Sequence, residues 1–162
     1  MRTGLLGSIL LLGSLTGCEA IARSAIDQRL DELHAAASRA DEASYFACFA
    51  PEGVFIGTDA TERWDVPAFR AFAHPHFSQG KGWTYRSTER HITLAPSNDV
   101  AWFDELLQND MLGTCRGSGV LRNIRGDWRI AQYNLSIPIP NDKAKTVVEM
   151  IRAAATTQNS SK

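Results

Sequence analysis

The sequence predicts one α+β domain, in which an antiparallel sheet is covered by helices from the N-terminal half. The first observation is an amphipathic pattern over residues 21–40, where apolar side chains recur at helical spacing. The second is a change to a period of two in the C-terminal half, which gives four strand candidates: 83–94, 100–108, 114–124 and 128–137. Turn-forming residues separate these candidates, so we expect an antiparallel meander with one face that helices must cover.

The remaining elements follow from local signals. Helical character continues through residues 41–49 until a proline and a glycine stop it, and residues 54–59 are β-branched and aromatic, which favours a strand. A further helix is expected to begin near Asp65, which can cap it, with Pro67 in its first turn. Residues 143–155 can form a short C-terminal helix.

The N-terminus has the pattern of a secretory signal. An uncharged apolar run follows Arg2 and ends in Leu15-Thr16-Gly17-Cys18, which resembles the lipobox of bacterial lipoproteins. The run is too short to span a bilayer. The resemblance implies a signal peptide over residues 1–17, lipidation of Cys18 and a tether over 18–25. Glu19 in the next position favours the outer membrane, with the domain facing the periplasm.

Composition limits the remaining possibilities. The formal net charge is −1, and acidic residues are interleaved with the basic ones, which argues against a nucleic-acid partner. The mature chain suits a single domain over 26–142, followed by a tail over 143–162. Cys48 and Cys115 can be two buried thiols or one disulfide, and the sequence leaves both open.

Four segments together resemble one bacterial subgroup of the SnoaL-like, or nuclear transport factor 2-like, superfamily with its cystatin-like fold. These segments are 55–64, 101–105, 115–120 and 128–136. The resemblance covers residues 26–142 and implies a cone-shaped, strongly curved antiparallel sheet, covered by N-terminal helices, that encloses a conical pocket. It does not imply one reaction, because this fold hosts isomerases, cyclases, dehydratases, assembly modules and non-enzymatic binders.

The last strand candidate indicates recognition rather than proton transfer. Alternation places Trp128, Ile130, Gln132, Asn134 and Ser136 on one face. Many relatives have two histidines at the positions of Gln132 and Asn134, and those positions face the cavity. Amides bind by hydrogen bonds but do not titrate, so Gln132 and Asn134 are predicted to contact a ligand.

The two preceding strands supply further candidates. We expect Trp102 and Asp104 to face the pocket with the last strand's set, although a β-bulge would exchange the faces. Arg116 and Ser118 are expected to face inward too. Arg116 then either forms a buried pair with Asp104 that orients an anionic ligand, or makes an ordinary cross-strand ion pair at the surface.

Asp104 and Asp59 are the candidate general bases. In ketosteroid isomerases of the superfamily the base lies on the first strand, near Gly57 here, and Asp59 is two residues further along the same face. The favoured alternative for Asp59 is an Asx turn. Trp64, which precedes the covering helix, is predicted to bind ligand as well as to pack. No metal-binding, phosphate-binding or dinucleotide motif is recognised, so no cofactor is expected.

Three functions are compatible with these residues. The preferred one is a lipid-anchored, non-catalytic protein that holds a small apolar or amphipathic molecule. The second is an isomerase- or cyclase-type enzyme that uses an aspartate base whose pKa is raised by burial. The third is a homodimeric or partner-docking module that uses a patch of Arg129, Tyr133 and Leu135.

Overall fold

The computed structural model describes residues 10–159, with side chains described from Gly17 to Ala154. It contains four helices within that range: α1 (Leu10–Ser38), α2 (Glu42–Ala47), α3 (Val66–Phe77) and α4 (Ala144–Asn159). The strands are β1 (Phe49–Ile56), β2 (Arg63–Asp65), β3 (Arg86–Leu94), β4 (Val100–Asn109), β5 (Gly113–Ile124) and β6 (Asp127–Ser136). The predicted meander is therefore present as β3 to β6.

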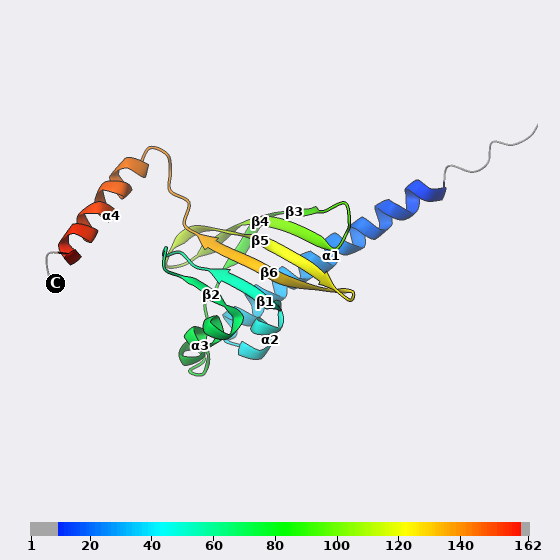
Figure 1. The fold of residues 1–162 in the computed structure, drawn as a ribbon, viewed down its shortest axis with the longest axis horizontal. Coiled ribbons are helices and arrows are strands. Elements are labelled where there is room, and N and C mark those ends of the chain that lie inside the picture. The colour runs from blue at the N-terminus through cyan, green and yellow to red at the C-terminus, as the bar shows by residue number, and fades with distance from the viewer. Residues whose placement is uncertain (1–9, 160–162) are drawn as a thin grey trace, which may run out of the picture.

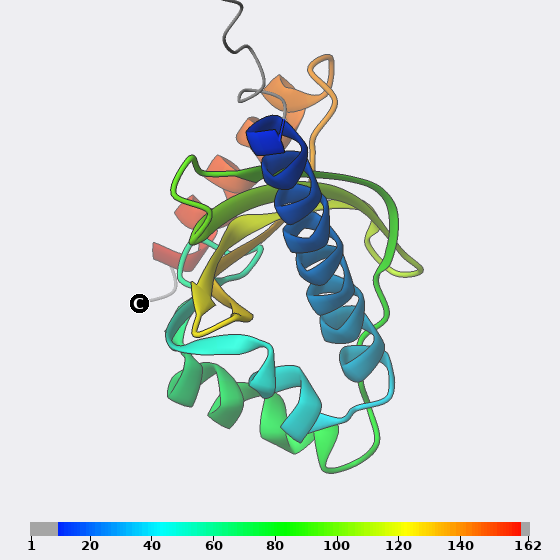
Figure 2. The ribbon, with the colours of Figure 1, turned by 90° about the vertical axis from the view of Figure 1, so that its right-hand side faces the viewer.

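All six strands form one mixed sheet in the order β2-β1-β6-β5-β4-β3 (Figure 1). The meander strands pair antiparallel, as predicted, whereas β1 lies parallel to β6. This parallel pair makes the sheet mixed instead of wholly antiparallel. The sheet bends around α1, with α2 and α3 at one end, so the expected α+β fold with a curved, helix-covered sheet is confirmed (Figure 2).

The core lies between α1 and the inner face of the sheet. Ile26, Leu30 and Leu33 recur on one side of α1 and are almost fully buried, which is the face that the helical periodicity predicts. Arg29 fixes the helix to the sheet, because its guanidinium donates to Trp128 O at 2.9 Å and to Asp127 Oδ1 at 2.6 Å. The C-terminal half of α1 is thereby held over the curved sheet.

A β-bulge in β6 changes which side chains face the core. Val120 pairs with Gln132 but Leu121 pairs with Ile130, so Ala131 is an extra residue on β6. Trp128 and Ile130 are buried before the bulge, and Tyr133 is buried after it. The predicted strict alternation along this strand is therefore wrong beyond Ile130. Tyr133 and Leu135, assigned to an outer dimer patch from the sequence, pack in the core instead.

Local contacts explain where one helix and one strand begin. The Asp65 carboxylate accepts from Ala68 N at 2.8 Å and Pro67 lies in the first turn, so the cap predicted for α3 is confirmed. β1 begins at Phe49, earlier than the predicted residue 54, because Phe49 pairs with Ile130 of β6 before the register shifts. The short strand β2 was not predicted.

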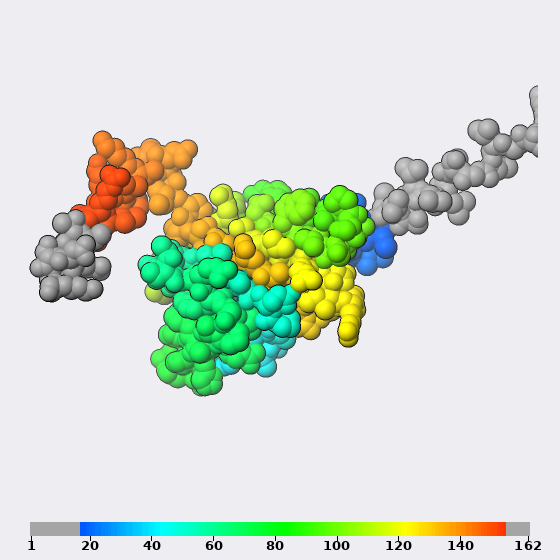
Figure 3. All heavy atoms as spheres, viewed as in Figure 1, coloured from blue at the N-terminus to red at the C-terminus, as the bar shows by residue number. Residues whose placement is uncertain are grey.

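The N-terminal part of α1 and the whole of α4 extend away from the body of the domain (Figure 1). α1 is continuous through Cys18, so residues 18–25 are helical, and residues 1–9 of the expected signal peptide lie outside the described residues. α4 stands apart from the sheet at the other end (Figure 3). Within the described residues, no helix combines the length and the hydropathy that a membrane crossing requires.

Candidate functional site

A cavity of ≈ 210 Å³ lies between the C-terminal half of α1, α3 and the sheet. Its wall is mostly aromatic, with a few polar side chains among the rings. The lining residues are Leu33, His34, Ala37, Tyr45, Phe55, Gly57, Thr58, Glu62, Trp64, Phe69, Phe72, Trp83, Tyr85, Leu112, Tyr133 and Leu135. An apolar cleft with few converging polar groups is the usual form of a small-molecule site.

One side of the cavity is built from stacked rings. The Phe55 and Phe69 centroids are 4.0 Å apart with an interplanar angle of 17°, and Trp64 lies against Phe72 at 4.8 Å and 22°. Tyr133 is parallel to Phe55 at 5.7 Å. Stacked rings drawn from α3, β1, β2 and β6 make this side of the cavity aromatic, which suits a ligand that contains a ring.

A buried carboxylate lies directly behind this cavity. Glu105 of β4 is 1% exposed, and its Oε1 accepts from His34 Nε2 at 2.8 Å and from the Tyr133 hydroxyl at 3.0 Å. Its Oε2 accepts from Arg90 Nε at 2.9 Å. Gly117 of β5 lies opposite Glu105, where a Cβ would come within 2.2 Å of the Tyr133 hydroxyl oxygen. Glycine at this position therefore leaves room for the network.

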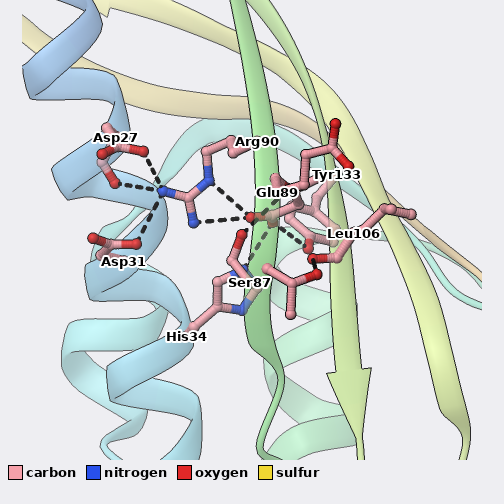
Figure 4. Close-up of polar contacts among 10 residues, drawn as sticks. Asp27, Asp31, His34, Ser87, Glu89, Arg90, Leu106 and Tyr133 are labelled. Atoms are coloured by element: carbon pink, nitrogen blue, oxygen red, sulfur yellow. Dashed lines mark hydrogen bonds and ion pairs between the residues drawn. The ribbon is translucent and has the colours of Figure 1, made fainter.

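Arg90 connects this carboxylate to the outer side of α1. Its Nη1 contacts Asp27 Oδ1 at 2.5 Å and Asp31 Oδ1 at 2.9 Å (Figure 4). Nη2 is 2.9 Å from Glu105 Oε2, an ion-pair distance, but that contact lacks hydrogen-bond geometry. The guanidinium thus bridges two exposed acids of the helix and one buried acid of the sheet.

The network keeps Glu105 ionised. Burial alone would raise the pKa of Glu105, but the hydrogen bond from His34 and the charge and hydrogen bond of Arg90 outweigh it and hold the pKa below its usual value. Burial, reinforced by the negative charge of Glu105, raises the pKa of Tyr133 well above its usual value. At neutral pH the pair is therefore a carboxylate and a neutral phenol that donates to it.

These contacts define the state of His34. A carboxylate can only accept, so Nε2 of His34 carries the hydrogen and, in the neutral ring, Nδ1 holds a free lone pair. Nδ1 makes no hydrogen bond within the part of the chain that the structure describes. A histidine that is oriented by a buried carboxylate and lines an apolar pocket can in principle exchange a proton with a bound ligand.

The structure places the β4 candidates on the other face of the sheet. Trp102 is 48% exposed and Asp104 is also exposed, whereas Ala101, Phe103 and Glu105 are buried. The expectation that Trp102 and Asp104 face the pocket is therefore wrong. Trp102 does share a face with Gln132 of the last strand, as expected, but the bulge in β6 turns that face away from the core.

The β5 and β6 candidates share that outer face. Arg116 and Gln132 are exposed, Ser118 and Asn134 are half-buried, and none of the four lines the cavity. The predicted inward orientation of Arg116 and Ser118 is wrong, because Cys115 and Gly117 take the inner positions. Arg116 is paired with Leu106 across the strands rather than with Asp104.

The first-strand candidates have different outcomes. Asp59 is exposed and accepts from Thr61 N at 2.8 Å, which confirms the Asx turn. The hydrogen bonds from Thr61 hold the pKa of Asp59 below its usual value, which disfavours it as a base. Trp64 does line the cavity.

Cys48 and Cys115 are free buried thiols, and burial raises the pKa of Cys48 to about 11.

Sequence reasoning missed His34, Arg90 and Glu105. One signal was present, because His34 lies four residues after Leu30 on the apolar face of the first helix. A polar side chain on such a face needs a buried partner. No sequence pattern identified Glu105 as that partner, since the contact joins residues 71 positions apart.

The family assignment follows from the extent of a sequence match. The SnoaL-like domain profile matches residues 26–140, which is more than half of the chain and includes the whole sheet and the cavity. The chain belongs to the SnoaL-like domain family. This SnoaL-like domain has the nuclear transport factor 2-like, or cystatin-like, fold with an N-terminal helix and a six-stranded mixed sheet.

Solved structures with similar folds come from several bacteria. A nuclear transport factor 2-like protein of unknown function from Pseudomonas putida KT2440 has a TM-score of 0.64 at 17% identity, covering 76% of this chain and 92% of that one. A protein of unknown function from Mycobacterium tuberculosis gives 0.66 at 18% identity, covering 88% and 82%. A scytalone dehydratase candidate from Novosphingobium aromaticivorans gives 0.64 at 10% identity, covering 76% and 89%. No curated protein matches the sequence significantly.

Proposed function

We propose that this SnoaL-like domain binds a small, largely apolar ring compound and transfers a proton on it, with His34 as the general base. The observation that carries the proposal is the contact of His34 with the buried Glu105 at the wall of an aromatic cavity. The reaction class would be isomerisation or dehydration next to a carbonyl group. This differs from the enzyme hypothesis drawn from the sequence, because His34 replaces an aspartate as base.

The contacts of His34 support a defined proton path. Nδ1 would take a proton from the carbon next to the carbonyl, and the ring would become an imidazolium. The Glu105 carboxylate, 2.8 Å from Nε2, would stabilise that positive charge. Tyr85 also lines the cavity, and burial raises its pKa, so a neutral hydroxyl is present to donate to the developing oxyanion.

The cavity limits the size of the ligand. At about 30 Å³ per water, ≈ 210 Å³ holds about seven water molecules, which is the space of a compound with one or two rings. The relatives described as dehydratase candidates fit this reaction class, although at such low identity they show only the fold.

Proton exchange provides a direct test. The full chain is incubated in D2O with cyclohexenone and tetralone, and deuterium incorporation next to the carbonyl is followed by NMR. We expect faster exchange with the wild type than with His34→Gln. His91→Gln is the matched control, since His91 is exposed on β3 and contacts Glu89 instead of the cavity. Equal exchange with the wild type and with His34→Gln would contradict catalysis by His34. If a ring compound then binds without faster exchange, that result supports the non-catalytic carrier.

We further propose that the protein is an envelope lipoprotein, anchored through Cys18 at the outer membrane and facing the periplasm. The lipobox-like segment supports this, together with the exposed position of Cys18 on α1. The cavity is lined by the C-terminal half of α1, so its ligand site would lie away from the anchor. Cys18→Ser should abolish labelling by palmitate and release the protein from the membrane fraction; retention in that fraction contradicts the anchor.

A homodimer is the partner that we propose. The support is Trp102, a large apolar side chain on the sheet face opposite α1, with the half-buried Val120 beside it. This surface replaces the patch expected from the sequence.

A further inference from the structure

Glu62 lies in a short loop that is closed by its own hydrogen bonds. The loop joins β1 to β2: Gly57 N donates to Glu62 O at 2.9 Å, and Glu62 N donates to Asp59 O at 3.0 Å. The Asx turn at Asp59 holds the tip of the loop. The backbone at Glu62 is therefore fixed beside the cavity.

The side chain of Glu62 is fixed as well. Its Oε2 accepts from Asp59 N at 3.1 Å, and the carboxylate lies over Gly57, where a Cβ would come within 2.1 Å of Oε2. Oε1 makes no hydrogen bond within the described residues. The absence of a side chain at Gly57 thus leaves room for the carboxylate of Glu62, which has one free acceptor oxygen at the wall of the cavity.

Glu62 has no ion-pair partner among the residues whose side chains the structure describes. Within residues 17–154, no Lys, Arg or His side chain forms an ion pair with it. Its negative charge is one of the causes, after burial and Cys115, that raise the pKa of Tyr85, another residue that lines the cavity. The ring of Trp64, two residues further along the chain, also lines the cavity. An unpaired carboxylate beside aromatic faces is an environment that favours a cation attached to a ring.

We propose that Glu62 selects ring ligands that carry a protonated amine. The inference rests on the proposed function, since it assumes that the cavity is the ligand site. The ammonium group would donate to Oε1 of Glu62 and lie near Trp64, while the ring of the ligand packs against the stacked aromatic side chains of the cavity. Ligands with a carboxylate at the same end would be repelled.

Three phenols with nearly the same shape test this selection. Tyramine, 4-ethylphenol and 4-hydroxyphenylpropionate differ in the charge at one end, and binding to the full chain is followed by tryptophan fluorescence. We expect tyramine to bind about tenfold more tightly than 4-hydroxyphenylpropionate, with less difference at high salt. Glu62→Gln should abolish the preference. Glu52→Gln, at the exposed pair with Arg122, should retain it.

The outcomes separate the two proposals. If 4-ethylphenol binds but tyramine is not preferred, or if Glu62→Gln keeps the preference, the role of Glu62 is refuted while the cavity stands as a ring site. If none of the three phenols binds the wild type, the ligand site itself is refuted and the role of Glu62 with it.

Discussion

Arg90 and Glu105 together carry opposite charges into the core, and the pair joins two layers of the fold. Glu105 is held by His34 and Tyr133 on one oxygen and by Arg90 on the other. Removal of Glu105 would leave the buried guanidinium of Arg90 with only the exposed acids Asp27 and Asp31 as partners. The network therefore supports the stability of the domain as well as the orientation of His34.

Glu105→Gln should lower the free energy of unfolding by about 3 kcal/mol, because it removes the buried partner of Arg90. Urea unfolding followed by circular dichroism measures the change. Glu52→Gln makes the same chemical change at an exposed ion pair and should cost less than about 1 kcal/mol. Equal losses in the two variants would show that the buried network adds nothing.

The pH dependence of stability follows from the lowered pKa of Glu105. A folded-state pKa below the unfolded value, about 4.3, gives stability that is present above pH 4.3 and is lost as pH falls through the folded pKa. The difference between wild type and Glu105→Gln should therefore stay constant from pH 7 to about 5 and shrink below about 4. Urea midpoints at these pH values test it; a difference that shrinks between pH 7 and 6 would contradict an ionised carboxylate.

At the scale of single residues, the sequence predicted local contacts better than distant ones. The Asx turn at Asp59 and the cap at Asp65 depend on residues two or three positions away, and both are present. The contact between His34 and Glu105 depends on how α1 lies across the sheet. Such a contact is visible only once the layers are placed.

At the scale of elements, the meander was predicted closely, since its turns and its period of two are local signals. The orientation of its strands was not, because the extra residue Ala131 exchanges the faces of β6. Gly119 helps to accommodate this region: a Cβ there would come within 2.0 Å of Gln132 O. The bulge and this glycine belong to one local arrangement.

Gly119→Ala should destabilise the domain by about 1–3 kcal/mol, because the added methyl group meets backbone rather than a movable side chain. Thermal and urea unfolding measure the loss. Ser118→Ala, the adjacent position on the outer face, should stay within about 0.5 kcal/mol of the wild type. A Gly119→Ala protein as stable as Ser118→Ala would show that β5 and β6 can move apart without cost.

At the scale of the whole molecule, the order of helices and strands was enough to predict the fold, because the layers follow from it. The homodimer that we propose depends on a surface that the order of elements does not reveal. Trp102 lies on the outer face of the sheet, because the side chains of β4 alternate in the opposite sense to the expected one. Trp102 is therefore at the surface of the domain and not in the cavity.

Trp102→Glu should convert a homodimer into a monomer, because a charge in the centre of an apolar contact is not paired. Size-exclusion chromatography with light scattering gives the mass, against 17.8 kDa for one chain. Met111→Glu, a fully exposed position in the β4–β5 turn, should leave the mass unchanged. A wild type that already runs as a monomer would refute this dimer.

α1 carries Cys18 and His34 on one uninterrupted helix, sixteen positions apart. At about 1.5 Å per residue, these positions are separated by about 24 Å along a rigid rod. With Cys18 anchored at a lipid surface, as we propose, the rigid helix would hold the domain at a fixed height above that surface. Lengthening the rod ahead of Ile26 would then raise the ligand site above the bilayer without altering its chemistry.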